Sequence, residues 1–419
     1  MVQIKSRRAI CALTVALLTL AGCGGGRGGQ SGDKASTPGI SSTSIKLGGS
    51  IPLTGSAAAF SVLAKSADAY FRYVNKEQGG VNGRQIEYEY LDDAYDPGRT
   101  VQNVRRLVEQ DQVLAIFQVL GTPTNMAIWD YLNSKSVPQL YSSTSSDAFG
   151  KALVSGEKPW SMTFNPPFDS EAATQASYLA SLPGKHTAAF LYQNDSFGQS
   201  VVKAFEPALK AVGIETVAKE SFAATDPSVD SQVVALASSK ADILINWNNP
   251  TPAAQAIRKA NQVGWSPKIV LSDAANSIGS VLKPAGLVAS KGVLSNAYQK
   301  DPSDPQWNND AGIKEYRAAL AKYAAGIDPA DPLAVEGYAQ AFVMVAALKG
   351  LRDPTRKSLM DSVLNMNSLE VPVLVPGISV HTTPKCPWPI TTERAERFDG
   401  TGWVLVGDPV HTKPIPSCG

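Results

Sequence analysis

The sequence has little histidine, little cysteine and almost no net charge. Its 419 residues include three histidines and four cysteines, and the formal net charge is +1. A nearly neutral chain without a basic block is a poor partner for nucleic acid. His186, His381 and His411 stand outside any motif that pairs a catalytic histidine with a nucleophile. G-x-S-x-G, H-E-x-x-H and P-loop patterns are also absent, so we expect no enzyme, no metal and no cofactor.

Long apolar runs are confined to the N-terminus. Three cations within the first eight residues precede an apolar stretch over 10–21, and small residues follow it. This order is typical of a secretory signal peptide over 1–22, and the stretch is too short to span a membrane. The LAGC sequence at 20–23 resembles a bacterial lipobox, which implies a diacylglycerol on the Cys23 thiol. An ordinary signal peptide and a core helix are the alternatives.

The residues after this signal indicate an anchored, extracytoplasmic protein. The segment 23–43 begins with the lipidated cysteine and is rich in Gly and Ser, which predicts a flexible linker. The folded body would then be held at the membrane, in the periplasm or on the outer face of the cytoplasmic membrane. Cys11 leaves with the signal. Cys386 and Cys418 remain as a pair in an oxidising compartment, which predicts one disulfide, with free thiols as the alternative.

Short apolar strands alternate with amphipathic helices from residue 44 onward. We expect strands over 45–53, 85–93, 113–120, 137–143, 186–193, 214–221, 242–247 and 267–272. We expect helices between them over 98–110, 169–182, 198–212, 229–239 and 251–263. This alternation predicts an α/β fold with parallel sheets and helices on both faces. About 380 residues exceed one core, so we expect two doubly wound Rossmann-like lobes.

The last third of the chain is too long to be a tail. It has helical patterns over 311–324 and 331–349, becomes Pro-rich, and ends in apolar runs around an Asp-Gly turn at 399–400. We expect the first sheet to be complete by about residue 150. The N-terminal lobe is expected to comprise residues 44–165 and about 297–375, and the C-terminal lobe residues 166–296 and about 376–419.

An acidic group lies before the helix predicted over 98–110. Asp92, Asp93 and Asp96 could suggest calcium, but the group lacks the glutamate and the spacing of an EF-hand loop. Asp96 is followed by proline, an order that favours the start of a helix. We therefore expect Asp96 to cap that helix.

Small hydroxyl residues gather in the loops that follow strands of the first lobe. These loops read IPLTGSAAAF, LGTPTN and LYSSTSSDAF. In doubly wound sheets, ligands bind at the carboxyl ends of the strands, where loops and helix N-termini present N–H groups. Hydroxyls and free amides there suit a carboxylate. Simple caps and turns are the alternative for each residue taken alone.

The second lobe offers different side chains at its own strand ends. Phe197, Asn248, Asn249 and Asp273 each follow a predicted strand. Aromatic rings could line an apolar group, and Asp273 could face an ammonium. Together the two lobes predict a cleft for a zwitterion with an apolar side chain.

The ordered features of the chain resemble the leucine/isoleucine/valine-binding family of ABC-importer receptors, which are type I periplasmic binding proteins. The resemblance runs from residue 44 to the end and rests on PLTG in the first strand loop, the GGVNGR turn, DDAYDP, and the late FDGTGWVLVGD. It implies two α/β lobes joined by a three-strand hinge that close on a small molecule. It also implies a monomer that delivers its ligand to a membrane permease powered by a separate ATPase.

The resemblance assigns residues of the first lobe to the ligand site. Gly121 and Thr122 match the loop that holds the ligand carboxylate. Ser143 and Ser145 match the loop that offers a carbonyl to the ammonium and donors to the carboxylate. Phe60 stands where the family often has a tyrosine lining the side-chain pocket. Glycine at 121 lacks the hydroxyl that amino-acid receptors of the family commonly use.

The resemblance also assigns residues of the second lobe. Phe197 and Asn249 match positions where tyrosines are common, and Asp273 matches an acid that pairs with the α-ammonium. Asp273 is one methylene shorter than the usual glutamate. The implied ligand is a branched-chain or other hydrophobic amino acid. The alternatives are a receptor for aromatic carboxylates, amides or urea, and a membrane-tethered sensor of the same fold.

Overall fold

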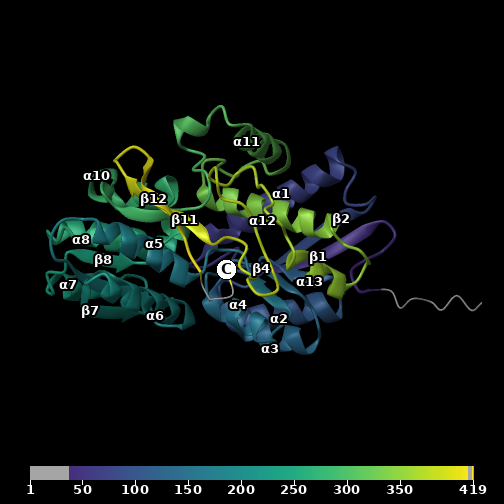
Figure 1. Cartoon of the computed structure of the whole chain (residues 1–419), viewed down its shortest axis with the longest axis horizontal. Coiled ribbons are helices and arrows are strands. Elements are labelled where there is room, and N and C mark those ends of the chain that lie inside the picture. Colours follow the sequence, from purple (N-terminus) through teal and green to yellow (C-terminus); the bar gives the residue numbers. More distant parts are fainter. Residues whose placement is uncertain (1–36, 414–417, 419) are drawn as a thin grey trace, which may run out of the picture. The chain divides into compact units, whose positions relative to one another are not determined.

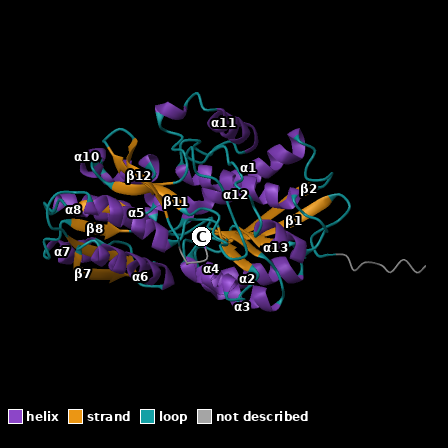
Figure 2. Cartoon of the chain, viewed as in Figure 1, coloured by secondary structure: helices purple, strands orange, loops and turns teal. Residues whose placement is uncertain are grey.

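A computed structural model describes residues 37–413 and Cys418 (Figure 1). The predicted signal peptide, the lipidation site at Cys23 and the linker as far as residue 36 lie outside the described residues. Over the described part, the chain forms two α/β lobes, and Figure 2 shows strands accompanied by helices in each. No helix in this part has both the length and the apolar content needed to cross a membrane.

The first lobe is built on a parallel sheet in the order β2-β1-β3-β4-β5. Its strands are β1 (Ser44–Ile51), β2 (Gln85–Asp92), β3 (Ala115–Phe117), β4 (Gln139–Ser142) and β5 (Ser161–Thr163). The expectation that this sheet ends by about residue 150 is wrong, because β5 adds a further strand. A three-residue strand is too short to show a period in the sequence.

Helices from both ends of the chain cover this sheet. They are α1 (Ser61–Glu77), α2 (Pro97–Glu109), α3 (Thr122–Ser134), α4 (Asp147–Val154), α11 (Ala311–Tyr323), α12 (Pro332–Lys349) and α13 (Arg356–Val363). The cap predicted for α2 is confirmed, since the Asp96 carboxylate accepts the N–H of Arg99 at 2.8 Å. A capping side chain of this kind satisfies an amide that the helix itself leaves unpaired.

The helix α12 is the central helix of the first lobe. It is buried on nearly every side and packs along α1. Their backbones come so close at Gly337 that a Cβ there would lie 2.2 Å from the carbonyl oxygen of Leu63. The hydroxyl of Ser66 also donates to the carbonyl of Ala334. Burial on all sides explains why α12 is apolar throughout rather than along one stripe.

The second lobe is built on a mixed sheet in the order β12-β11-β10-β9-β8-β6-β7. Its strands are β6 (Thr187–Gln193), β7 (Glu215–Phe222), β8 (Ile243–Asn246), β9 (Lys268–Leu271), β10 (Leu294–Ala297), β11 (Thr392–Phe398) and β12 (Trp403–His411). Strands β6 to β10 run parallel, while β11 and β12 form an antiparallel hairpin against β10. The hairpin turns at the predicted Asp-Gly pair.

One helix of the second lobe precedes its first strand, and the others lie between successive strands from β6 to β10. They are α5 (Phe168–Ala180), α6 (Ser196–Ala211), α7 (Asp230–Ala237), α8 (Pro250–Gln262), α9 (Lys283–Ala285) and α10 (Leu287–Ser290).

Short helical turns occur in both lobes, at η1 (Ala58–Phe60), η2 (Asp273–Ala275), η3 (Ile278–Leu282) and η4 (Pro305–Trp307). The turns η1 and η2 become important because they carry side chains of the ligand cavity.

Within residues 44–411 the chain passes between the lobes three times. The connections are 164–167 after β5, 298–310 after β10, and 364–391 before β11. Two of them pair with each other, since the N–H of Val375 donates to the carbonyl of Tyr298 at 3.0 Å. These connections are the places where the lobes can change their relative position.

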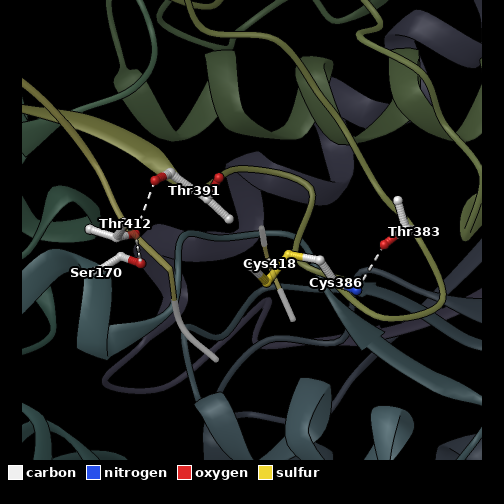
Figure 3. The surroundings of a disulfide bond; sticks show 6 residues. All are labelled: Ser170, Thr383, Cys386, Thr391, Thr412 and Cys418. Atoms are coloured by element: carbon white, nitrogen blue, oxygen red, sulfur yellow. Dashed lines mark hydrogen bonds between the residues drawn. A yellow bond between two sulfur atoms is a disulfide. The ribbon is translucent and has the colours of Figure 1, made fainter. Parts of the chain in front are cut away.

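A disulfide joins Cys386 to Cys418 near the last connection (Figure 3). The N–H of Cys386 donates to the hydroxyl of Thr383 at 3.0 Å. Just after β12, the Thr412 hydroxyl donates to the carbonyl of Thr391 at 3.0 Å and also contacts the Ser170 hydroxyl on α5. The C-terminal segment is therefore attached to the second lobe by hydrogen bonds and to the connection by a covalent bond.

Candidate ligand-binding site

A cavity lies where the strand ends of the two lobes meet. The eight residues predicted from the sequence as ligand-binding all line it: Phe60, Gly121, Thr122, Ser143, Ser145, Phe197, Asn249 and Asp273. Asn248, which the sequence also placed at a strand end of the second lobe, lines the cavity as well. The lining further includes residues that were not predicted as ligand-binding: Tyr95, Leu120, Thr144, Asn165, Phe168, Trp247, Ser272, Ala274 and Glu336. The structure therefore brings the predicted residues together around one space.

The first-lobe side of the cavity contains the N-terminus of α3. Gly121 precedes the helix and no side chain caps it. The N–H of Thr122, at the first helical position, has no acceptor within the helix. An uncapped helix start directs free N–H groups and the positive end of the helix dipole at the cavity, which suits an anion.

Glycine at position 121 is required by the local geometry. Its φ is +95°, in a region that side chains rarely adopt, and a Cβ would lie 2.5 Å from Cε2 of Tyr95. A side chain that carries a hydroxyl could not fit here. The backbone N–H of Gly121 donates to the carbonyl of Ser143 at 3.0 Å, so this N–H is not available to a ligand.

The loop after β4 supplies hydroxyl groups with different surroundings. The Ser143 hydroxyl accepts from Nε2 of Gln340 at 2.8 Å, which leaves its own proton to donate. The Ser145 hydroxyl donates to the carboxyl of Glu171 at 3.1 Å. Thr122 and Thr144 share a hydrogen bond of 2.7 Å between their hydroxyls. Ser145 thus has a protein acceptor already, whereas the Ser143 hydroxyl can donate either to the carboxyl of Glu336 or to a ligand.

Aromatic rings line the apolar side of the cavity. Phe168 and Phe197 pack with their ring centroids 5.9 Å apart. Phe60 lies on η1 and is buried with Tyr95 in one apolar cluster. Trp247, at the end of β8, is almost fully buried. Rings on both lobes can therefore surround an apolar ligand group.

Asn249 joins the two lobes beside the cavity. It precedes α8 without capping it, and its Nδ2 donates to Oε1 of Gln193 at 3.1 Å. The hydroxyl of Tyr95, on the first lobe, hydrogen-bonds to the side chains of both Gln193 and Asn249. Burial raises the pKa of Tyr95, so this hydroxyl stays neutral. The lobes are therefore in direct polar contact at this edge.

Asp273 provides a buried carboxylate on the second-lobe side. It begins η2, is 8 % exposed, and its Oδ1 accepts the N–H of Ala274 at 2.8 Å. Burial raises its pKa to about 6, although the Ala274 hydrogen bond opposes the shift. None of the described residues that line the cavity is a lysine, arginine or histidine. The cavity therefore has no protein cation to balance the Asp273 carboxylate, and a cationic group of a ligand would balance it.

The described residues contain no group of three or more His, Cys, Asp or Glu side chains that could hold a metal ion. The cavity is thus made of hydroxyls, amides, rings and carboxyls. Such a lining can bind and orient a small polar molecule.

The sequence matches the profile of the periplasmic binding protein family over residues 44–383. The chain belongs to this family. Among curated periplasmic binding proteins, it is 24 % identical to the Leu/Ile/Val-binding protein homolog 7 of Brucella suis over 321 residues, covering 74 % of this chain and 78 % of that protein. It is 21 % identical to an amino acid binding protein of Pseudomonas aeruginosa over 295 residues, covering 66 % and 71 %.

Solved structures of periplasmic binding proteins share the fold. A branched-chain amino acid ABC transporter protein from Thermus thermophilus with bound valine has a TM-score of 0.78 at 14 % identity, over 89 % of this chain and 98 % of that one. A fatty acid ABC transporter substrate-binding protein from Thermomonospora curvata has a TM-score of 0.75 at 24 % identity, over 90 % and 95 %. At these identities the likeness establishes the type I fold with two lobes.

Several lining residues of this periplasmic binding protein were not predicted from the sequence. Asn165 and Phe168 follow β5, the short strand that the pattern did not reveal. Tyr95 lies in the DDAYDP stretch, which was interpreted as a helix cap only. Glu336 lies within α12. A single acid in a long apolar helical run was the available signal for that residue.

Proposed function

We propose that this protein is the extracytoplasmic receptor of an ABC importer and that its ligand is a hydrophobic amino acid, a branched-chain one above all. One observation carries the proposal. The cavity opposes the uncapped start of α3 and the Ser143 hydroxyl to the Asp273 carboxylate, with aromatic rings alongside. This arrangement suits a carboxylate, an ammonium and an apolar side chain on one small molecule.

The residues have separate roles in this proposal. Thr122 and Ser143 donate to the ligand carboxylate, while Asp273 accepts from the ammonium. Phe60 and Phe197 enclose the side chain, and Asn249 holds the lobes together through Tyr95. The names of the Brucella relatives and the valine of the Thermus neighbour support an aliphatic amino acid.

A thermal-shift screen tests the proposal. The purified protein is mixed with the L-amino acids, with amides and urea, with aromatic carboxylates, and with fatty acids. A ligand that binds the folded state alone raises Tm by mass action. We expect a hydrophobic L-amino acid to give the largest rise. A rise with amides or carboxylic acids and none with amino acids would contradict the ligand assignment.

A receptor for carboxylic acids is the second candidate. The Thermomonospora neighbour is described as a fatty acid transport protein, and the free amides at α3 would hold any carboxylate. The fatty acids and aromatic acids in the same screen separate it from the first candidate.

Delivery to a permease is proposed from the family. We propose that Cys23 anchors the protein to the membrane by a lipid and that the protein works as a monomer. A membrane-tethered sensor would have the same anchor and cavity. Uptake of the radiolabelled ligand separates the two, because deleting the gene of a transport receptor abolishes uptake and deleting that of a sensor does not.

A further inference from the structure

The cavity contains a second carboxyl that the proposed function does not use. Glu336 lies on α12 in the first lobe and lines the same space as Asp273 of the second lobe. It is 3 % exposed. The two acids therefore approach one ligand from opposite lobes, and they lie near enough that Asp273 contributes to the shift in the Glu336 pKa.

Glu336 is surrounded by neutral donors. Its Oε1 accepts from Nδ2 of Asn165 at 3.1 Å and from Nε2 of Gln340 at 3.2 Å. The Ser143 hydroxyl also hydrogen-bonds to this carboxyl. The amide oxygen of Gln340 in turn accepts from Gln118. These bonds fix the position of the carboxyl without neutralising a charge on it.

Two residues that line the cavity each carry an acceptor atom with no donor. The side-chain oxygens of Asn165 and Asn248 are buried and have no hydrogen-bond partner among the described residues, although both residues line the cavity. Asn165 is 5 % exposed and Asn248 is 1 % exposed. A buried acceptor without a partner costs about 1–3 kcal/mol, so such atoms indicate a donor that a ligand would bring.

The other ionisable groups around the two acids are also acidic. Glu171 on α5 and Glu393 on β11 are fully buried, and the phenol of Tyr298 lies in the same field. Burial raises the pKa of Glu336 to about 8, and the negative charge of Asp273 acts in the same direction. Closing the lobes therefore brings these acidic groups together in a buried space, where either bound protons or a cation of the ligand must compensate for their negative charge.

We propose that Glu336 is a specificity-determining residue that shares the cationic nitrogen of the ligand with Asp273, so that tight binding requires an amine. This inference rests on the proposed function and narrows it. A carboxylic acid without an amine would leave the two acids without a cationic partner and the two amide oxygens without a donor. The site then selects amino acids over carboxylic acids of the same shape.

The test uses three probes of nearly the same shape. L-Leucine carries both charged groups, 4-methylpentanoate lacks the amine, and 3-methylbutylamine lacks the carboxylate. If another L-amino acid gives the largest shift in the screen, that amino acid and its deaminated and decarboxylated counterparts replace them. Titration calorimetry measures each with the wild type, with Glu336→Gln and with Glu393→Gln. The last variant removes a buried acid that does not line the cavity.

For the wild type, we expect the amino acid to bind at least about tenfold more tightly than its deaminated counterpart. Glu336→Gln keeps an oxygen for Asn165 and Gln340, and it should weaken the amino acid about ten- to one-hundred-fold while leaving the deaminated acid unchanged or tighter. Glu393→Gln should keep the wild-type preference. Binding should also release protons, which appears as a dependence of the heat on the ionisation enthalpy of the buffer.

Three results would overturn the inference. They are equal binding of the amino acid to wild type and Glu336→Gln, equal binding of the amino acid and its deaminated counterpart to wild type, and an equal loss with Glu393→Gln. Each of these three results is compatible with the proposed receptor function, because a ligand still binds to the wild type. If no compound of the screen binds the wild type, the proposed function fails with it.

Discussion

Tyr95 and Gly121 leave no room for a side chain between them. A Cβ on Gly121 would lie 2.5 Å from Cε2 of the tyrosine ring, and the φ of +95° disfavours any side chain at this position. Tyr95 in turn hydrogen-bonds to Gln193 and Asn249 across the lobes. Position 121 therefore has no side chain because Tyr95, which hydrogen-bonds to the second lobe, occupies the space that a side chain would need.

Adding a hydroxyl at this position should therefore harm the protein. We expect Gly121→Ser to lower the free energy of unfolding by about 2–5 kcal/mol, through backbone strain and the clash with Tyr95. Urea unfolding measures the loss. Gly83→Ser is the matched control, because Gly83 has a φ of +76° and a Cβ added there would meet no atom within 4 Å. Equal losses for the two variants would show that the Tyr95 contact has no effect.

Removing the Asp273 carboxylate should weaken binding of an amine-bearing ligand. We expect Asp273→Ala to cost about 2–5 kcal/mol of affinity, which is the usual result when one partner of a buried charge pair is truncated. Calorimetry with the best amino acid of the screen measures it. Asp130→Ala, at an exposed carboxylate on α3, is the control and should bind as the wild type does. Unchanged binding to Asp273→Ala would refute the assignment.

The stability of the ligand-free protein should fall as pH rises from about 4 to 8. Burial raises the pKa of Asp273 to about 6 and of Glu336 to about 8, above the values of 3.8 and 4.5 for free carboxyls. The folded state then binds more protons than the unfolded state in this window, so stability decreases with pH, by up to about 7 kcal/mol in total. Urea titrations at several pH values measure the slope. The double variant Asp273→Asn/Glu336→Gln should reduce the slope, because Asp147 and Asp331 keep their own raised pKa values. An unchanged slope would contradict the assignment.

Breaking the disulfide should destabilise the C-terminal segment. The bond closes a loop with a sequence separation of 32, for which chain entropy gives a stabilisation of about 3–4 kcal/mol. We expect Cys386→Ser/Cys418→Ser to unfold at lower urea concentration than the wild type. Reductant should lower the wild type to the same midpoint and leave the variant unchanged. Coincident midpoints for the oxidised wild type and the variant would show that the bond adds no stability.

Replacing Cys23 should release the protein from the membrane. This residue lies outside the described residues, and the expectation rests on the sequence at 20–23. We expect Cys23→Ser to move from the membrane fraction to the soluble extracytoplasmic fraction, and intact-mass spectrometry to show the loss of the diacylglycerol. Cys11→Ser is the control, because the predicted cleavage removes it. A wild-type protein whose mass lacks the diacylglycerol would exclude lipid anchoring at this position.

The sequence was most informative where local rules decide the structure. The helix predicted over 98–110 appears as α2, one residue earlier at each end, because Asp96 and the following proline determine its start locally. The candidate residues could be gathered on one cavity because the carboxyl ends of parallel strands share an edge. Both inferences need only the order of strands and helices.

Features that depend on distant neighbours could not be predicted. From the sequence, Glu336 is an isolated acid in an apolar helix, and its hydrogen bonds with Asn165 and Gln340 become visible only in the structure. Ser145 looks like a free donor until Glu171 from the other lobe is seen to accept its proton. The strand β5 is defined by its pairing with β4 rather than by its own three residues.

The close packing of Gly337 against Leu63 connects a position outside the cavity to the placement of Glu336 inside it. Gly337 is the immediate neighbour of the acid at 336, so the packing of the two helices also determines where that carboxyl lies. A bulkier residue at 337 would displace the carboxyl while leaving every cavity residue intact. Such a change, remote from any contact with the solute, would be detected first as altered selectivity.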